Sequence, residues 1–301
     1  MIKVAVIGAG QRGKDTYADY VLKGMEGVEV VGVAEPIRER REYMKNHHHL
    51  RDEFLFESWE QLLAIDKFCD AVLICTNDDM HYEPAKLALE KGYHILLEKP
   101  MTNTLEEVDK LENLAINYPN QVFMVCHVLR YTPFFSTIKR LIDEGAIGKI
   151  ASIQHNENIG YYHMAHSFVR GNWRNSVETS PIILAKSCHD FDILNFLVGA
   201  KCIKIASFGN LQHFKKECMP LKASSRCIDC LIESDCPYSA LKLYPQNIGK
   251  WPTSVITENQ TEEGVKEALA HGPYGRCVYC CDNDVMDHQV TILEFENGVS
   301  A

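Results

Sequence analysis

Several groups of residues in this 301-residue chain have types and spacings that suit chemistry. Near the start, Gly8, Gly10 and Gly13 form the pattern G-x-G-x-x-G directly after an apolar run. Glycines at these positions allow a tight turn, a close approach of the backbone to a pyrophosphate, and close packing of helix on strand. The following helix offers N–H groups to the anion. The pattern predicts a dinucleotide-binding loop in preference to a plain glycine-rich turn.

An acidic residue follows the second apolar run. Glu35 lies about 20 residues beyond the glycines, where a carboxylate accepts hydrogen bonds from ribose hydroxyls and repels a 2′-phosphate. This favours NAD over NADP. Arg38, Arg40 and Arg41 leave NADP open, because a guanidinium turned toward the ribose can hold the extra phosphate. The other interpretation of this basic run is the solvated face of a helix.

Two later apolar runs end in CTNDDMH and LLEKP, and ligands of open α/β sheets bind beyond the carboxyl ends of strands. Lys99 there can hydrogen-bond a substrate oxygen, and Pro100 biases it toward extended geometry; the plainer alternative is a surface lysine. The predicted cofactor-binding residues are Gly8, Gly10, Gln11, Arg12, Gly13, Glu35, Arg40, Thr76, Asn77, His81, Glu98 and Lys99.

Five short apolar runs must position these residues: 2–8, 28–35, 70–77, 93–99 and 121–127. They alternate with stretches of helical spacing, which is typical of a parallel sheet covered on both faces. The fold class is therefore α/β. We expect a Rossmann domain over 1–128 and a substrate and oligomerisation domain over 129–301, with a cysteine-rich insert at about 210–285.

Composition narrows the class of partner. The chain is 46% hydrophobic and 24% charged, with a net charge of −10 and no long basic run, so we expect no nucleic-acid partner. No cationic leader and no apolar stretch of about 18 residues is present, so we expect no membrane association and a cytoplasmic location.

Three longer stretches carry a family resemblance: TNDDMHYEPAKLALEKGYHILLEKP (76–100), LRYTPFFSTIKRLIDEGAIGKI (129–150) and CHDFDILNFLVG (188–199). With the glycine motif they resemble the Gfo/Idh/MocA oxidoreductases over nearly the whole chain, and EKP is the most specific mark. The resemblance implies a Rossmann domain, then an α/β domain with an open, mostly antiparallel sheet, and a cleft for NAD(P) and a sugar or cyclitol. It also implies that Lys99 and His189 act on the hydroxyl being oxidised.

The chain departs from many relatives just before His189. Ala185 stands where they carry an aspartate, and Lys186 follows it. Positions 186 and 189 share a helix face, so both side chains can serve one site. The predicted catalytic residues are Lys99, His189 and Lys186: His189 accepts the hydroxyl proton, Lys99 stabilises the developing oxyanion, and Lys186 assists by its charge. A lone histidine on an apolar helix is otherwise a core residue.

Substrate ligands are predicted less directly. By resemblance, Trp173 and Arg174 line the cleft. Arg130, which we predict to bind substrate, is a polar candidate near a strand end, as are His127 and His155, and each of the three could equally be a structural hydrogen-bonding group.

The twelve cysteines fall into two populations. Five are scattered among apolar residues, and seven crowd into the last third: Cys218, Cys227, Cys230, Cys236, Cys277, Cys280 and Cys281. Cys227-x-x-Cys230 with Cys236 and Cys277 predicts a closed four-thiolate zinc site, with Cys218, Cys280 and Cys281 as substitutes for the fourth ligand. An iron–sulfur cluster is the main rival, because C-x-x-C followed by C-P resembles ferredoxin ligands, and reduced free thiols are the remaining alternative.

The last residues predict a strand, a turn at Asn297-Gly298 and a short returning strand. We expect from this that the C-terminal part is truncated and that the exposed strand edge recruits a second copy, giving a homo-oligomer through the C-terminal sheet.

Three functions remain open. The leading one is an NAD-dependent dehydrogenase acting on a hydroxyl of a sugar or cyclitol. The second is a glycosidase that uses NAD transiently, by oxidation and elimination. The third is a sensor or co-regulator that binds NAD without catalysis.

Overall fold

A computed structural model describes residues 1–301, and the chain divides into two compact units, Met1–His127 and Val128–Ala301. Each unit has its own apolar core. No helix anywhere in these residues combines the length and the apolar character that crossing a membrane requires.

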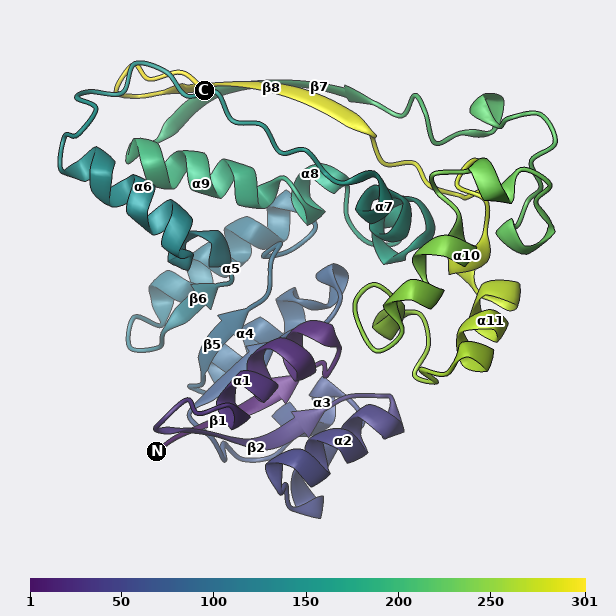
Figure 1. Ribbon diagram of the computed structural model, residues 1–301. Helices are drawn as coiled ribbons and strands as arrows, with labels where there is room; N and C mark the ends of the chain where they lie inside the picture. Colours follow the sequence, from purple (N-terminus) through teal and green to yellow (C-terminus); the bar gives the residue numbers. More distant parts are fainter. The chain divides into compact units, whose positions relative to one another are not determined.

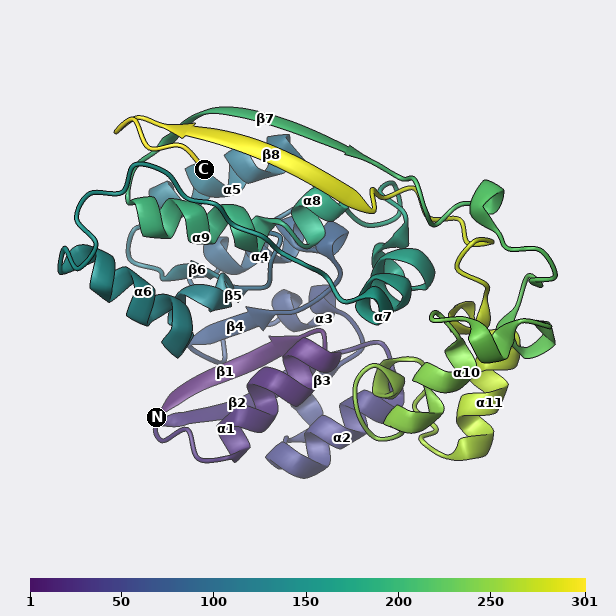
Figure 2. The same ribbon diagram turned by 45° about the horizontal axis from the view of Figure 1, so that its top comes forward.

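The first unit is built on a six-stranded parallel sheet in the order β3-β2-β1-β4-β5-β6 (Figures 1 and 2). Side chains alternate between its two faces: Val4 and Val6 pack into one core cluster, Ala5 and Ile7 into the other. The strands are β1 (Ile2–Ile7), β2 (Val28–Ala34), β3 (Leu55–Phe56), β4 (Ala71–Ile74), β5 (His94–Leu97) and β6 (Phe123–Val125).

Helices connect these strands and cover the sheet, which explains why the strands are apolar on both faces. Residues 11–18 wind as a π-helix that continues into α1 (Asp19–Leu22). Ser58 and Thr104 cap α3 and α5 by accepting hydrogen bonds from the N–H groups of Gln61 and Glu107. The remaining bounds are α2 (Arg38–His48), α3 (Trp59–Ala64), α4 (Tyr82–Glu90) and α5 (Leu105–Asn117).

The second unit has a smaller sheet than the sequence predicts. Instead of an open sheet of several strands, β7 (Cys202–Asn210) pairs with β8 (His288–Phe295) as an antiparallel ribbon. One face of the ribbon packs on α9 (Cys188–Val198), where Leu194 meets Leu293 and Phe295 (Figure 2). The other helices of this part are α6 (Pro133–Asp143), α7 (Tyr161–His163) and α8 (Ile182–Ala185).

The predicted turn after β8 is present. Gly298 has a φ of 84°, and the N–H of Phe295 donates to the carbonyl of Val299. Leu293 and Ala301 then exchange a pair of backbone hydrogen bonds, so the last residues lie alongside β8.

Between β7 and β8, residues 211–287 form only short helices and turns. The longest is α11 (Glu262–His271), and α10 (Ala240–Leu243) is a single turn. Tyr244, Val265 and Leu269 make a small core with Cys227. This segment covers the predicted cysteine-rich insert. Its sequence has no regular apolar periodicity, which agrees with the absence of strands named in the structure between residues 211 and 287.

Candidate functional site

The glycine loop after β1 has space on one side only. Gly8 has a φ of 89°, and a Cβ there would lie 2.7 Å from the carbonyl oxygen of Cys75. A Cβ on Gly13 would collide with the carbonyl of Gly8. A Cβ on Gly10 would meet nothing closer than Nη1 of Arg40 at 3.9 Å. Gly8 and Gly13 are required by the fold itself, whereas the open side of Gly10 fits a ligand that approaches the backbone, as a pyrophosphate does.

The predicted cofactor residues share one edge of the sheet. Thr76 and Asn77 follow β4, and Glu98 and Lys99 follow β5. The strand order reverses between β1 and β4, and this reversal is where open α/β sheets bind their ligands.

Glu35, directly after β2, connects the glycine loop to its neighbour. Its carboxylate is 4% exposed and accepts hydrogen bonds from the N–H groups of Ala9 at 2.7 Å and Ile37 at 3.0 Å. Arg41 donates to the carbonyls of Glu35 and Pro36, which fixes the bend into α2. Arg40 is the member of the basic run that lies next to Gly10.

Glu98 joins the glycine loop to the EKP segment. It accepts hydrogen bonds from Nε of Arg12 at 2.7 Å, from the hydroxyl of Tyr17 at 2.6 Å and from the N–H of Lys99 at 3.0 Å. Burial alone would raise the pKa of Glu98, but the charge of Arg12 and these hydrogen bonds outweigh it and hold the pKa below its usual range. Arg12, predicted to contact the cofactor, thus has a positioning partner that the sequence did not indicate.

His81 is fully buried and lies between the loops after β4 and β5. Its Nδ1 is 2.8 Å from the carbonyl oxygen of Pro100, and its Nε2 is 3.2 Å from that of Thr76. These contacts give His81 a role in holding the two loops together.

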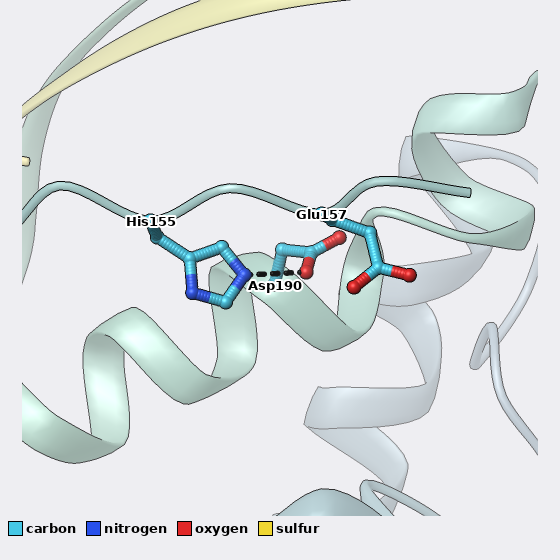
Figure 3. Close-up of side chains that lie close together, drawn as sticks. All are labelled: His155, Glu157 and Asp190. Carbon is cyan, nitrogen blue, oxygen red and sulfur yellow. Dashed lines mark hydrogen bonds and ion pairs between the residues drawn. The ribbon is translucent and has the colours of Figure 1, made fainter. Parts of the chain in front are cut away.

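In the second unit, α9 carries His189, Asp190 and Asp192 near its start. Asp190 accepts a hydrogen bond from His155 at 2.7 Å, and Lys186 forms an ion pair of 2.6 Å with Glu157. Figure 3 shows His155 and Glu157 reaching from one extended segment toward Asp190 on the helix. Burial raises the pKa of Asp190 above its usual range despite the hydrogen bond from His155.

These side chains line a cavity of about 480 Å³ in the second unit. Its polar lining includes His155, Glu157, Lys186 and Asp190. Glu157 and Asp190 were not among the predicted site residues. The alternation His-Asn-Glu at 155–157 was the available signal, because residues two apart on an extended segment share a face.

The two arginines predicted to bind substrate are held by carboxylates. Nε and Nη2 of Arg130 donate to Asp192 at 2.8 and 2.6 Å, and Arg174 makes a similar fork with Asp282 at 2.9 Å for both bonds. Trp173 packs at the margin of the core around Met164 and Phe168. In these contacts the arginines brace the fold, Arg130 against α9 and Arg174 against the end of the cysteine-rich segment.

The zinc site predicted at Cys227, Cys230, Cys236 and Cys277 is not supported. A tetrahedral zinc ion holds its thiolates about 3.8 Å apart. No three of these sulfur atoms lie within 4.8 Å of one another; the one group of potential ligands that does is His155, Glu157 and Asp190. The four cysteines nevertheless line one cavity.

The strand order, the glycine loop and the acidic residue after β2 together define a dinucleotide-binding Rossmann unit. The chain belongs to the Gfo/Idh/MocA oxidoreductase family: residues 2–127 match its NAD-binding Rossmann fold and residues 139–300 match its C-terminal alpha/beta domain.

Named relatives agree with this assignment. The chain is 28% identical over 217 residues to the scyllo-inositol 2-dehydrogenase (NAD(+)) of Bacillus subtilis, a match covering 70% of this chain and 58% of that protein. It is 24% identical over 207 residues to the inositol 2-dehydrogenase of Corynebacterium glutamicum, covering 68% and 56%. The chain therefore spans less than two thirds of the length of these curated relatives.

Among solved structures, the scyllo-inositol dehydrogenase of Lactobacillus casei with bound NAD(H) and scyllo-inositol superposes with a TM-score of 0.64 at 16% identity. The match covers 100% of this chain and 69% of that one. At this identity the likeness concerns the fold.

Proposed function

We propose that the protein is an NAD-dependent oxidoreductase that acts on a hydroxyl of a cyclitol or sugar. The observation that carries the proposal is Lys99, which follows β5 on the same sheet edge as an open glycine loop. Two relatives named as inositol dehydrogenases support the substrate class.

In this proposal, bound NAD supplies the acceptor for the hydride. His189 accepts the hydroxyl proton, and the ammonium of Lys99 stabilises negative charge on the substrate oxygen. Glu98 fixes the backbone at Lys99 by accepting its N–H. Lys186 completes the proposed catalytic set. Because Glu157 balances the charge of Lys186, we propose that Lys186 helps to orient the substrate.

The cavity of the second unit also supports a polyol. Its lining offers the carboxylates of Glu157 and Asp190, and carboxylates accept hydrogen bonds from hydroxyl groups. Trp173, Arg130 and Arg174 are the further substrate ligands in this proposal, with Asp192 and Asp282 holding the guanidinium groups of the two arginines in place.

The test is turnover with NAD or NADP on scyllo-inositol, myo-inositol and a panel of free sugars, measured as NADH or NADPH formed. Lys99→Met should lower kcat by about 10²–10³ while leaving the Kd for NAD unchanged. Lys91→Met is the matched control, because Lys91 donates to the carbonyl of Ile65 away from the sheet edge. Unchanged turnover in Lys99→Met would remove the mechanism. Cleavage of an aryl glycoside without net formation of NADH would favour the alternative function, a glycosidase that oxidises its substrate transiently.

We also propose a homo-oligomer formed through the outer face of the β7–β8 ribbon. This face carries Phe208, Val290 and Ile292, which are 77%, 67% and 64% exposed. Side chains of this kind gathered on one face are typical of a protein interface. Light scattering should give a multiple of the 34.2 kDa chain mass, and Phe208→Lys should reduce it to one chain.

A further inference from the structure

Four cysteines that are far apart in the sequence surround one cavity of about 140 Å³ in the second unit. Cys227 and Cys230 begin and follow one helical turn, Cys236 follows the next turn, and Cys277 comes from the segment that leads back to β8. Cys277 is held beside Cys227 because its N–H donates to the carbonyl of Ser225 at 2.8 Å. Cys218, Cys280 and Cys281 are not part of the cavity wall.

The spacing of these thiols is wider than a single tetrahedral ion requires. One zinc ion touches all four sulfur atoms and leaves no space between them, so the sulfurs stand about 3.8 Å apart. Here no three of them lie within 4.8 Å of one another. The space that they enclose is several times the 10–15 Å³ or so that one water molecule needs. A larger group fits this space.

The cavity wall also contains a buried positive charge. Arg170 is 1% exposed, and its Nη2 donates to Sγ of Cys227 at 3.5 Å. Its Nη1 is buried and has no hydrogen-bond partner. No carboxylate pairs with this guanidinium, although a buried cation ordinarily requires a counter-charge. An anionic group in the cavity would supply it.

We propose that Cys227, Cys230, Cys236 and Cys277 bind a four-iron, four-sulfide cluster. Each thiol loses its proton and binds one iron at a different corner of the cluster, so the sulfurs stand farther apart than around one ion. A cluster of two ferrous and two ferric ions with four sulfides and four thiolates has a net charge of −2, which Arg170 partly balances. The side chains of Pro237, Tyr238 and Tyr279 in the cavity wall limit the access of water to such a cluster, and Glu233 and Asp235 also belong to this wall. The site is independent of the proposed dehydrogenase activity.

The experiment is to purify the 301-residue chain without oxygen and to measure iron, acid-labile sulfide and zinc. The apoprotein is then reconstituted with equal amounts of ferrous and ferric iron and with sulfide. We expect about four irons and four sulfides per chain, with a broad visible absorption that dithionite bleaches. Cys230→Ser should lose most of the iron. Cys280→Ser is the matched control and should keep it, because Cys280 lies outside the cavity wall and contacts Met219.

Three results would overturn the proposal. They are one zinc per chain without iron or sulfide, failure of the wild-type chain to take up iron and sulfide, and equal loss of iron from Cys230→Ser and Cys280→Ser. Iron and sulfide counts on the wild-type chain keep the test decisive if Cys230→Ser does not fold. Dinucleotide binding, measured on the same samples, reports on the proposed function separately.

Discussion

The glycine loop and the four-cysteine cavity are both built from short loops, but they are held in opposite ways. The glycine loop connects a buried strand to a helix, and the backbone pairing of β1 with β2 and β4 fixes its start. The cysteine cavity lies in a segment without strands, where the side chain of Arg170 bonds the carbonyls of Tyr238 and Arg276. The sheet therefore orders the first site, and a buried side chain orders the second.

The two sites also differ in whether a buried charge has a partner of opposite charge within the chain. In the first unit, the carboxylate of Glu98 has a cationic partner in Arg12. In the second, Arg170 has no carboxylate partner. The first arrangement is electrostatically complete within the chain, whereas the second is completed by the ligand that we propose.

The largest expected effect comes from removing Arg170. Arg170→Met leaves two partly buried carbonyl groups, of Tyr238 and Arg276, without their donor, and each costs about 1–3 kcal/mol. We expect the free energy of unfolding of the second unit to fall by about 2–6 kcal/mol. Denaturant unfolding measures this free energy, and hydrogen exchange monitors the two units separately.

Arg140→Met is the control for this change. Arg140 makes an exposed i,i+4 pair with Glu144, so its removal should cost about 0.5 kcal/mol or less. If Arg170→Met were as mild as Arg140→Met, the buried arginine would not be what orders the cysteine-rich segment.

Acidification below pH 6.5 should weaken the second unit more than the first, because the pKa of His166 is lowered further than that of His48. Burial lowers the pKa of His166 from 6.5 to about 3, and the charges of His163 and Arg170 add to this effect. The unfolded chain therefore binds a proton that the folded chain refuses, and stability falls as the pH drops below 6.5. Between pH 6.5 and 5 the loss from His166 should be about 1.6 kcal/mol.

The contribution of Glu98 has the same sign but a lower window. Because the folded-state pKa of Glu98 is lowered, its stabilisation is present above pH 4.5 and is lost as the pH falls through the folded-state pKa.

The variant that tests His166 is His166→Gln. It should flatten the pH dependence of unfolding between pH 7 and 5, whereas His47→Gln, at an exposed position, should not. Equal slopes in the wild type and His166→Gln would contradict the assignment to His166.

The contrast between the regions also explains what the sequence could predict. The alternation of Val4, Ala5, Val6 and Ile7 between two cores is a local pattern, so the parallel sheet and the edge that carries Lys99 were predictable. The zinc prediction is not supported, because ligand spacing along the chain does not fix the distances between sulfur atoms in space. Nothing near Arg170 in the sequence indicates that it is buried among cysteines from residues 227 to 277.

The ion pairs of Arg130 and Arg174 were missed because their partners are also distant in the sequence. Arg130 and Asp192 are 62 residues apart, and Arg174 and Asp282 are 108 apart. The sequence offered Arg130 as a polar candidate and, by resemblance, Arg174 as a cleft residue, but only the fold reveals that each already has a carboxylate partner. The two-stranded ribbon is a further case, since the family resemblance implied a larger sheet.

A smaller effect separates two glycines within the first site. Gly13→Ala forces its Cβ against the carbonyl of Gly8 and should cost about 1–3 kcal/mol of stability. Gly10→Ala meets only open space beside Arg40 and should leave stability nearly unchanged. Both should weaken NAD binding, measured by calorimetry, the first by deforming the loop and the second by obstructing the pyrophosphate. Normal NAD binding by Gly10→Ala would show that no ligand approaches that backbone.

The smallest expected effect concerns the threonine N-caps of one helix in each region. Thr104 caps α5 in the first unit, and Thr261 caps α11 in the cysteine-rich segment by accepting a hydrogen bond from the N–H of Gly264. Thr→Ala should cost about 1 kcal/mol at either position, because each leaves a helix N–H without its acceptor. The helix α11 packs Val265 and Leu269 against Cys227, so Thr261→Ala should also speed the loss of iron from a loaded protein, whereas Thr104→Ala should not. Equal rates of iron loss in the two variants would separate the helix from the cavity and leave Arg170 as the main support of the cysteines.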